Sequence, residues 1–165
     1  MRVINDLSIL TTGTDLRASK EIQIVDQLIM KEILFVCEGN VGRSQMAEGF
    51  YKHYRGNDSA ISAGVTDAGA KYNNTPRQDI VSAMKERGID ISDQRIKPIS
   101  EEMLDEVQDV VVLCDPTRLP PFLQEGRSHV VFKPVQDPFE SSMDGVREVR
   151  DSIEKIILEL INERE

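Results

Sequence analysis

The chain has 165 residues, a length that fits one domain with a buried core and is short for two domains of ordinary size. Charged residues make up 30% and hydrophobic residues 39% of the chain, a composition typical of globular proteins rather than disordered or membrane-embedded ones. The net charge of -9 argues against binding to nucleic acid, because such binding relies on Lys and Arg side chains that neutralise phosphates.

Residues 1–29 do not share the pattern of the rest of the chain. A short helix is predicted after Asp15, which is placed to cap it, whereas residues 11–14, Thr-Thr-Gly-Thr, are typical of a loop. The apolar residues of this helix are Leu16, Ile22, Val25, Leu28 and Ile29. Two interpretations stay open: residues 1–29 are an N-terminal extension that packs on a domain of residues 30–165, or an upstream start codon was wrongly included.

Four short apolar or β-branched runs, each bounded by turn residues, predict buried strands at residues 32–37, 60–63, 110–113 and 129–132. Helical patterns lie between them, over residues 44–55 and from Pro76 to a stop at Gly88. This alternation predicts an α/β fold: a single doubly wound domain with a four-stranded parallel sheet and helices on both faces.

Two of the predicted helices carry apolar stripes. In the helix over residues 44–55 the stripe consists of Met46, Ala47, Phe50, Tyr51 and Tyr54. The last helix has the clearest period, with Val146, Val149, Ile153, Ile156, Ile157 and Leu160 on one side and charges opposite. We expect the stripe of the last helix to lie in the core rather than to bind a partner.

Features that the sequence lacks indicate where the protein is located and which ligands it does not need. No apolar stretch approaches the roughly 20 residues that span a bilayer, and the N-terminus has no secretion-signal pattern, so a cytoplasmic protein is expected. Cys37 and Cys114 form no CxxC pair, and His53 and His129 stand alone. Neither a disulfide framework nor a metal site is therefore expected, and no organic cofactor is required.

The most informative segment is residues 37–44, Cys-Glu-Gly-Asn-Val-Gly-Arg-Ser, directly after the first predicted strand. A cysteine at the end of a buried strand, followed by a glycine-containing loop that opens a helix, places backbone N–H groups and a helix N-terminus around one point. Such a point binds an oxyanion and favours the thiolate over the thiol. Cys37 is therefore the predicted nucleophile.

The other loop residues have supporting roles in this interpretation. Arg43 is spaced to bind a tetrahedral oxyanion through two parallel hydrogen bonds, and Ser44 to hydrogen-bond the sulfur. Asn40 either ties the loop together from a left-handed backbone or is a simple turn residue. The loop residues expected to bind the oxyanion or support the loop are Glu38, Gly39, Asn40, Val41, Gly42 and Ser44. Glu38 is unusual, since a carboxylate opposes phosphate binding unless it points to solvent.

Thiolate attack on a phosphate ester needs an acid that protonates the departing oxygen. Asp137, followed by Pro138, lies in the loop after the fourth predicted strand, and such loops converge at the carboxyl edge of a parallel sheet. Asp137 is the candidate acid; the alternative is that Asp-Pro only starts a turn. Phe139 either forms an aromatic wall or packs.

Several separated motifs together resemble the low-molecular-weight protein tyrosine phosphatase superfamily, which includes the thioredoxin-coupled arsenate reductases. They are residues 33–50, ILFVCEGNVGRSQMAEGF; residues 62–64, SAG; residues 88–92, GIDIS; and Asp137-Pro138. The resemblance runs from about Met30 to the C-terminus. It implies that Cys37 is the nucleophile, that Arg43 binds the oxyanion and that Asp137 protonates the leaving group.

Within the superfamily, some residues resemble the reductases. Residues 44–49, SQMAEG, and Cys114 match proteins in which a second cysteine attacks the first to form a disulfide. The reductases carry a third cysteine shortly afterwards, and residues 115–123 contain none. A Cys37–Cys114 disulfide would then need thioredoxin or an external small thiol as its reductant. The alternative is that Cys114 is a buried residue at a strand end.

The phosphatase interpretation has departures too. Many phosphatases have a cysteine where this chain has Gly42, and often a tyrosine where it has Phe139, but neither change removes the chemistry. We predict hydrolysis of a phosphotyrosine protein or small aryl phosphate through a phosphocysteine intermediate. The alternative is arsenate reduction by Cys37 with Cys114 or an external thiol. A third hypothesis, a non-catalytic phosphate-binding module, is disfavoured because candidates for nucleophile, oxyanion ligand and acid are all present.

Overall fold

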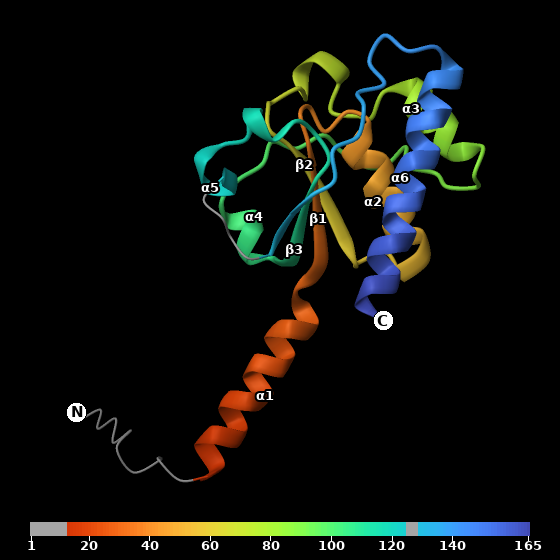
Figure 1. Cartoon of the computed structure of the whole chain (residues 1–165). Helices are drawn as coiled ribbons and strands as arrows, with labels where there is room; N and C mark the ends of the chain where they lie inside the picture. The colour runs from red at the N-terminus through yellow and green to blue at the C-terminus, as the bar shows by residue number, and fades with distance from the viewer. Residues whose placement is uncertain (1–12, 125–128) are drawn as a thin grey trace. The chain divides into compact units, whose positions relative to one another are not determined.

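The structure is a computed structural model that describes residues 13–124 and 129–165 (Figure 1). The chain divides into two units, one ending at Met30 and one spanning Lys31–Glu165. In the first unit, helix α1 spans Gly13–Ile29. None of the helices in the described ranges is long and apolar enough to cross a membrane.

Helix α1 differs from its prediction at its start. Gly13 and Thr14, which were expected in a loop, are helical, and Asp15 is the third helical residue instead of the cap. A glycine in a helix costs only about 1 kcal/mol relative to alanine, so the turns that follow can override it. Residues 11 and 12 of the expected loop lie outside the described residues.

The larger unit is built on the predicted four-stranded parallel sheet. Its strands are β1 (Lys31–Cys37), β2 (Ala60–Gly64), β3 (Val107–Val112) and β4 (Val130–Phe132), in the order β2-β1-β3-β4. The expectation that every strand is buried is wrong for β4, which lies at the edge of the sheet and has Val131 and Phe132 exposed. The last pair in the register of β1 and β2 is Cys37 with Gly64. The carboxyl ends of β1 and β2 therefore lie side by side, at the edge of the sheet that carries the candidate nucleophile.

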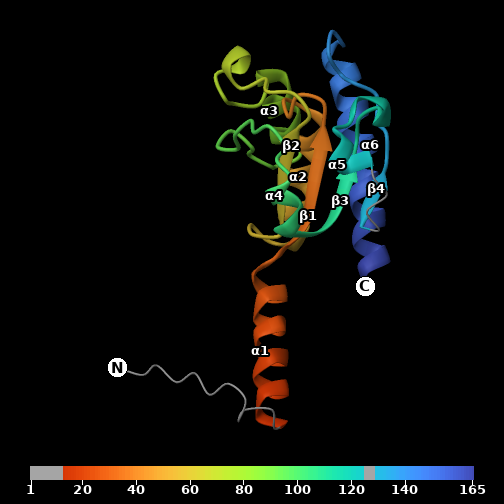
Figure 2. The ribbon, with the colours of Figure 1, turned by 90° about the vertical axis from the view of Figure 1, so that its left-hand side faces the viewer.

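Helices cover both faces of this sheet, as predicted (Figures 1 and 2). One core joins the sheet to α2 (Arg43–Arg55), α3 (Gln78–Lys85) and α6 (Met143–Arg164), and the other joins it to α4 (Glu102–Asp105) and α5 (Pro121–Gln124). Two short 3-10 helices, η2 (Ala70–Tyr72) and η3 (Pro116–Arg118), complete the elements. The four short helices escape prediction because three or four residues are too few to show a helical period.

Alternation along β1 explains the two cores. Ile33 and Phe35 face the first core, whereas Leu34 and Val36 face the second, and all four are at most 1% exposed. The expected stripe of α6 is buried in the first core, except that Ile156 is half-buried at its border. Burying one such side chain contributes roughly 1.5–3 kcal/mol, so these faces hold the helices on the sheet.

Two predicted helix details are wrong. Helix α3 begins at Gln78 rather than at Pro76, because Arg77 between them has extended backbone with ψ of 140°. Tyr54 leaves the stripe of α2: its side chain is exposed, and its hydroxyl donates to Glu154 at 2.8 Å.

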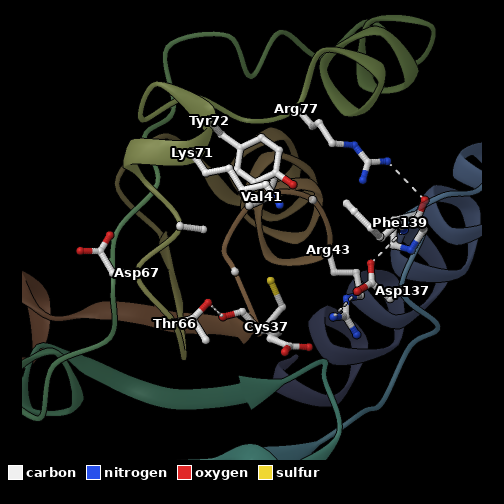
Figure 3. A pocket seen from close by; sticks show the side chains of 15 residues that line it. Cys37, Val41, Arg43, Thr66, Asp67, Lys71, Tyr72, Arg77, Asp137 and Phe139 are labelled. Atoms are coloured by element: carbon white, nitrogen blue, oxygen red, sulfur yellow. Dashed lines mark hydrogen bonds and ion pairs between the residues drawn. The ribbon is translucent and has the colours of Figure 1, made fainter.

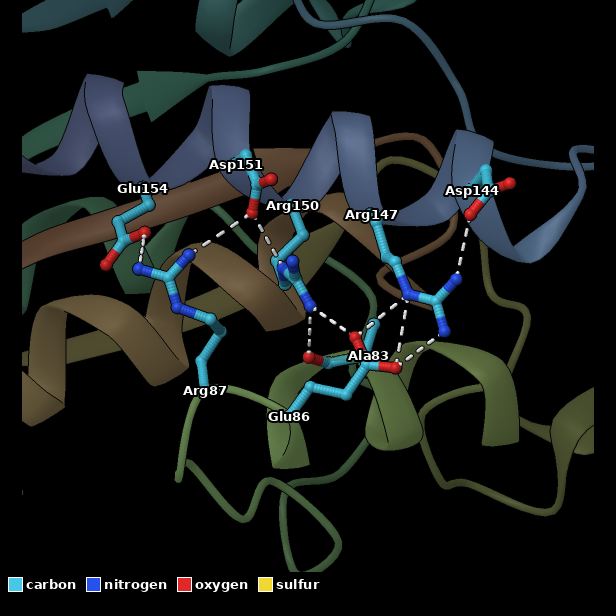
Figure 4. Close-up of polar contacts among 8 residues, drawn as sticks. All are labelled: Ala83, Glu86, Arg87, Asp144, Arg147, Arg150, Asp151 and Glu154. Carbon is cyan, nitrogen blue, oxygen red and sulfur yellow. Dashed lines mark hydrogen bonds and ion pairs between the residues drawn. The ribbon is translucent and has the colours of Figure 1, made fainter.

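An ion-pair cluster joins α3 to α6 on the outside of the first core (Figure 4). Arg150 is buried and donates to the carbonyl oxygen of Ala83 at 2.8 Å and to Glu86 at 2.7 Å. Arg147 donates to the same carboxylate at 2.8 Å. Arg147 and Arg150 together lower the pKa of Glu86 to about 2.

Candidate active site

The loop after β1 lies against a pocket of about 390 Å³ at the carboxyl edge of the sheet (Figure 3). Strand β1 ends at Cys37 and helix α2 begins at Arg43, so the strand, loop and helix follow each other as predicted. The Cys37 side chain lines this pocket, and its sulfur lies 2.9 Å from the Ser44 hydroxyl oxygen. A helix N-terminus has N–H groups without intrahelical acceptors, which favours an anion beside this sulfur.

A buried polar network lies under the loop, and we call four of its side chains, Asn40, Ser44, Gln45 and Ser62, the floor. All four are 0% exposed. The Asn40 amide donates to the hydroxyls of Ser44 at 2.8 Å and Ser62 at 2.9 Å. Its oxygen accepts hydrogen bonds from Gln45 at 3.1 Å and from the backbone N–H of Lys97 at 2.9 Å.

Asn40 is held in the left-handed region with φ of 56°, where Asn is tolerated better than most residues. Its side chain therefore ties the loop together as one of its two sequence interpretations expected. Ser62, Gln45 and Lys97 were missed as members of this network. Ser62 and Gln45 stand inside the quoted motifs, but a motif does not state which of its hydroxyls and amides meet.

Gly64 lets the end of β2 approach the loop closely. A Cβ atom at this position would lie 2.7 Å from the carbonyl carbon of Gly39 and 2.8 Å from the nitrogen of Asn40. Both neighbours are backbone atoms that cannot turn aside, so a side chain here would push the loop away from the sheet. The glycine of the SAG motif thus allows the loop to pack directly against the end of β2.

Arg43 connects the loop to the segment that carries the candidate acid. Its guanidinium donates to the carbonyl oxygen of Val135 at 3.0 Å and lies 3.5 Å from a carboxylate oxygen of Asp137. The Arg43 side chain is 7% exposed and the Asp137 side chain 52%. The backbone N–H of Phe139 donates to the Asp137 carboxylate at 3.0 Å, which orients this carboxylate beside the pocket.

Glu38 pairs with a residue that the sequence did not single out. Its carboxylate accepts a hydrogen bond from Arg118 of η3 at 2.7 Å. The charge that seemed to oppose phosphate binding is therefore compensated by a cation from the segment after β3. Arg118 was missed because the two residues are 80 positions apart in the sequence.

The mouth of the pocket is formed by Lys71, Tyr72, Asp137 and Phe139, which we call the rim (Figure 3). Phe139 is 50% exposed, so it is a wall of the pocket rather than a core residue. Lys71 and Tyr72 come from η2, and Arg77 from the start of α3 stands beside them. The segment from Val65 to Arg77 carries no motif, and sequence reasoning missed all three residues.

The predicted site residues fall into three groups. The pocket is lined by Cys37, Glu38, Gly39, Val41, Gly42, Arg43 and Asp137. Asn40 and Ser44 lie beneath it in the floor. Cys114 does not line it, although it follows β3 and shares the second core with Cys37. Burial, together with the nearby Cys37, raises the pKa of the Cys114 thiol to about 11.

A parallel sheet with a cysteine at the end of its first strand, a glycine-containing loop and an arginine at the opening of a helix defines a protein of the α/β class with a cysteine-centred candidate site. The chain belongs to the family described as low molecular weight phosphotyrosine protein phosphatase, which it matches over residues 32–164. Both the fold and the family agree with the resemblance seen in the sequence.

Individual relatives carry reductase names. The arsenate reductase of Halalkalibacterium halodurans is 46% identical over 85 residues, which are 51% of this chain and 57% of that protein. The chain thus spans little more than half the length of that relative. The glutaredoxin arsenate reductase of Synechocystis sp. is 34% identical over 135 residues, covering 80% of this chain and 97% of that protein. A solved structure of an arsenate reductase in the phosphate binding state is 32% identical, with a TM-score of 0.68 over 81% of this chain and 98% of that one.

Proposed function

We propose that the protein hydrolyses phosphate monoesters of aromatic alcohols, such as phosphotyrosine, through a phosphocysteine intermediate. The observation that carries this proposal is the meeting of three groups at one pocket: the Cys37 sulfur, the Arg43 guanidinium and the Asp137 carboxyl group. The aromatic side chains of Tyr72 and Phe139 at the mouth favour an aryl group as the part of the substrate that leaves.

In the first step, the Cys37 thiolate attacks phosphorus and forms an S–P bond while the P–O bond to the aryl oxygen breaks. Arg43 and the backbone N–H groups of the loop bind the phosphoryl oxygens, whose charge they stabilise as it shifts during the transfer. Asp137, protonated at this point, gives its proton to the departing oxygen. The Ser44 hydroxyl, 2.9 Å from the sulfur, stabilises the thiolate before attack.

In the second step, water attacks phosphorus on the same intermediate and the S–P bond breaks. The Asp137 carboxylate takes a proton from this water, inorganic phosphate leaves, and the electron pair of the S–P bond returns to Cys37 as a thiolate. Asp137 suits both steps because half of its side chain is open to solvent, from which the water can come.

The test is turnover of p-nitrophenyl phosphate by the full chain and by Cys37→Ser. Wild type should release nitrophenolate, and Cys37→Ser should lose the activity by at least about a thousandfold, since the nucleophile acts as part of a unit. Full activity in Cys37→Ser would falsify the mechanism. Binding of inorganic phosphate without turnover of any aryl phosphate would favour the non-catalytic binding module instead.

Arsenate reduction is a second candidate, favoured by the names of the relatives and by the presence of Cys114 in the same core as Cys37. Cys37 would displace water from arsenate to form a thiol ester of arsenic. The Cys114 thiolate would then attack the Cys37 sulfur, forming a disulfide and passing two electrons to arsenic, which leaves as arsenite. Thioredoxin or a small thiol would reduce the disulfide and itself become oxidised.

The raised pKa of Cys114 weighs against this route at neutral pH. Burial favours the neutral thiol of Cys114, whereas attack on the Cys37 sulfur needs the thiolate. Arsenate-dependent oxidation of a thiol donor should be assayed beside aryl phosphate hydrolysis on wild type and Cys114→Ser. A reductase that uses both cysteines would lose activity in Cys114→Ser, whereas one that uses Cys37 with an external thiol would keep it; a phosphatase would keep its hydrolysis in that variant.

A further inference from the structure

The wall of the pocket at Phe139 carries two cations of different character. The Arg77 guanidinium carbon lies 5.6 Å from the centre of the Phe139 ring, and the Lys71 ammonium nitrogen 5.7 Å from it. Lys71 also lies 5.4 Å from the centre of the Tyr72 ring (Figure 3). Both cations therefore stand next to the place where an aryl substrate would enter.

Arg77 is already engaged by the protein. It donates two parallel hydrogen bonds to Asp79, at 2.7 and 2.6 Å, and a third to the carbonyl oxygen of Pro138 at 3.2 Å. Its role is to join the start of α3 to the loop that holds the acid. Arg43, the remaining arginine of the pocket lining, is paired with Asp137.

Lys71 forms no ion pair among the residues that the structure describes; its ammonium group contacts only aromatic rings there. It is exposed and belongs to the short helix η2 at the mouth. The carboxylates that line the pocket do not compensate it: Glu38 bonds Arg118, and Asp137 faces Arg43. Asp67 lies on the far side of the mouth from Phe139 (Figure 3).

We propose that Lys71 makes the enzyme select substrates that carry a carboxylate beside the phosphorylated aromatic residue, as in an acidic phosphotyrosine peptide. The inference rests on the proposed phosphatase function and adds its substrate class. With the phosphoryl group at Cys37 and the aryl ring between Tyr72 and Phe139, the flanking peptide crosses the mouth where Lys71 stands. An acidic side chain there gains an ion pair next to an apolar wall, whereas Asp67 repels it from the opposite side.

The test compares two phosphotyrosine peptides that differ only in having Glu or Gln on either side of the phosphotyrosine. Wild type should favour the Glu peptide roughly threefold to fivefold in kcat/KM at low ionic strength, the usual size for an exposed pair, and salt should reduce the ratio. Lys71→Met should bring the ratio to about one or below, and Lys71→Arg should restore it. Asp67→Asn should raise it. Lys85→Met, which removes an exposed lysine of α3 outside the pocket, is the matched control and should leave the ratio unchanged.

Binding separates this inference from the proposed function. The same two peptides should bind Cys37→Ser with the same preference, and Cys37→Ser with Lys71→Met should lose it, as measured by fluorescence anisotropy. Selective binding without any turnover by wild type would overturn the phosphatase but keep the acidic selectivity. Turnover with equal kcat/KM for the two peptides, or a ratio that survives Lys71→Met, would overturn the selectivity and keep the phosphatase.

Discussion

The floor and the rim of the candidate active site are held in different ways. The floor side chains are 0% exposed and bond one another and backbone groups from separate segments, such as the carbonyl oxygen of Arg95 and the N–H of Lys97. In the rim, Asp137 and Phe139 are about half exposed, and the contacts are one hydrogen bond between these two residues, a 3.5 Å ion pair and cation–ring contacts. The fold therefore fixes where the sulfur lies, whereas loosely held side chains decide what reaches it.

Asn40→Ala should have the largest effect on stability. It removes the hydrogen bonds to the Ser44 and Ser62 hydroxyls, leaves the Lys97 N–H without its acceptor, and places alanine at φ of 56°. Ser44 keeps its contact with Cys37, and Ser62 keeps its hydrogen bond to Glu48. Lost buried hydrogen bonds cost about 1–3 kcal/mol and the backbone about 1 kcal/mol more, so the free energy of unfolding should fall by roughly 3 kcal/mol in a urea titration.

Asn40→Gly is the matched control for this prediction. Glycine accepts the left-handed backbone, so it should recover about 1 kcal/mol of the loss while still lacking the amide. If both variants were as stable as wild type, the floor would not be the rigid layer described above.

Asp137→Asn should act on the reaction and spare the fold. Phenyl phosphate turnover should fall about 100-fold, the usual size of general acid catalysis, while the thermal unfolding midpoint stays within about a degree of wild type. The loss should be smaller for p-nitrophenyl phosphate, because nitrophenolate departs more easily without a proton. A large drop in the thermal unfolding midpoint would show that the rim also stabilises the fold, which contradicts the difference drawn between floor and rim.

Ser44→Ala should have a smaller effect on both turnover and stability, because this hydroxyl contacts the Cys37 sulfur and also accepts a hydrogen bond from Asn40. Turnover should fall about tenfold with the loss of one hydrogen bond to the thiolate, and unfolding should cost about 1 kcal/mol less. Asn40 keeps its bond to Ser62, which limits the damage. Steady-state kinetics and urea titration on the same preparation check both; unchanged kcat would show that the 2.9 Å contact does not serve the nucleophile.

Glu86→Gln tests the ion-pair cluster between α3 and α6, which lies apart from both the floor and the rim. This substitution should have the smallest effect on stability. The Arg147 and Arg150 side chains lower the pKa of Glu86 from 4.5 to about 2, so the native state favours its carboxylate. The stabilisation is therefore present above pH 4.5 and is lost as the pH falls toward 2. The difference in urea midpoint between wild type and Glu86→Gln should shrink between pH 5 and pH 3, with activity at neutral pH unchanged. A difference in urea midpoint that stays constant between pH 5 and pH 3 would contradict the lowered pKa of Glu86.

The sequence was sufficient for the sheet and for the loop that carries the candidate nucleophile. Runs such as residues 33–36 are apolar throughout because both faces of β1 are covered, and this signal survives without any tertiary information. The positions of Cys37, Arg43 and Ser44 follow from one continuous segment, so their proximity could be predicted.

Asp137 and Phe139 of the rim could be predicted from the sequence, but Lys71 and Tyr72, and the meeting of the two segments, could not. Lys71 and Phe139 are 68 positions apart and meet only because η2 and the loop after β4 converge at the same edge of the sheet. Neither residue lies in a regular pattern, and exposed side chains leave little trace in hydrophobic periodicity. The same holds for Arg118, whose partner Glu38 looked uncompensated from the sequence.

The hydrogen bond from the Lys97 amide to the Asn40 side chain has a consequence for exchange with solvent. Lys97 also accepts from the N–H of Gly64 at 2.8 Å, so its backbone joins the loop to the end of β2 from both sides. Its amide proton can exchange for deuterium only when the loop and the strand end separate, which needs opening of the buried floor as well. This proton should therefore exchange about as slowly as those of the central strands, even though it lies outside every helix and strand.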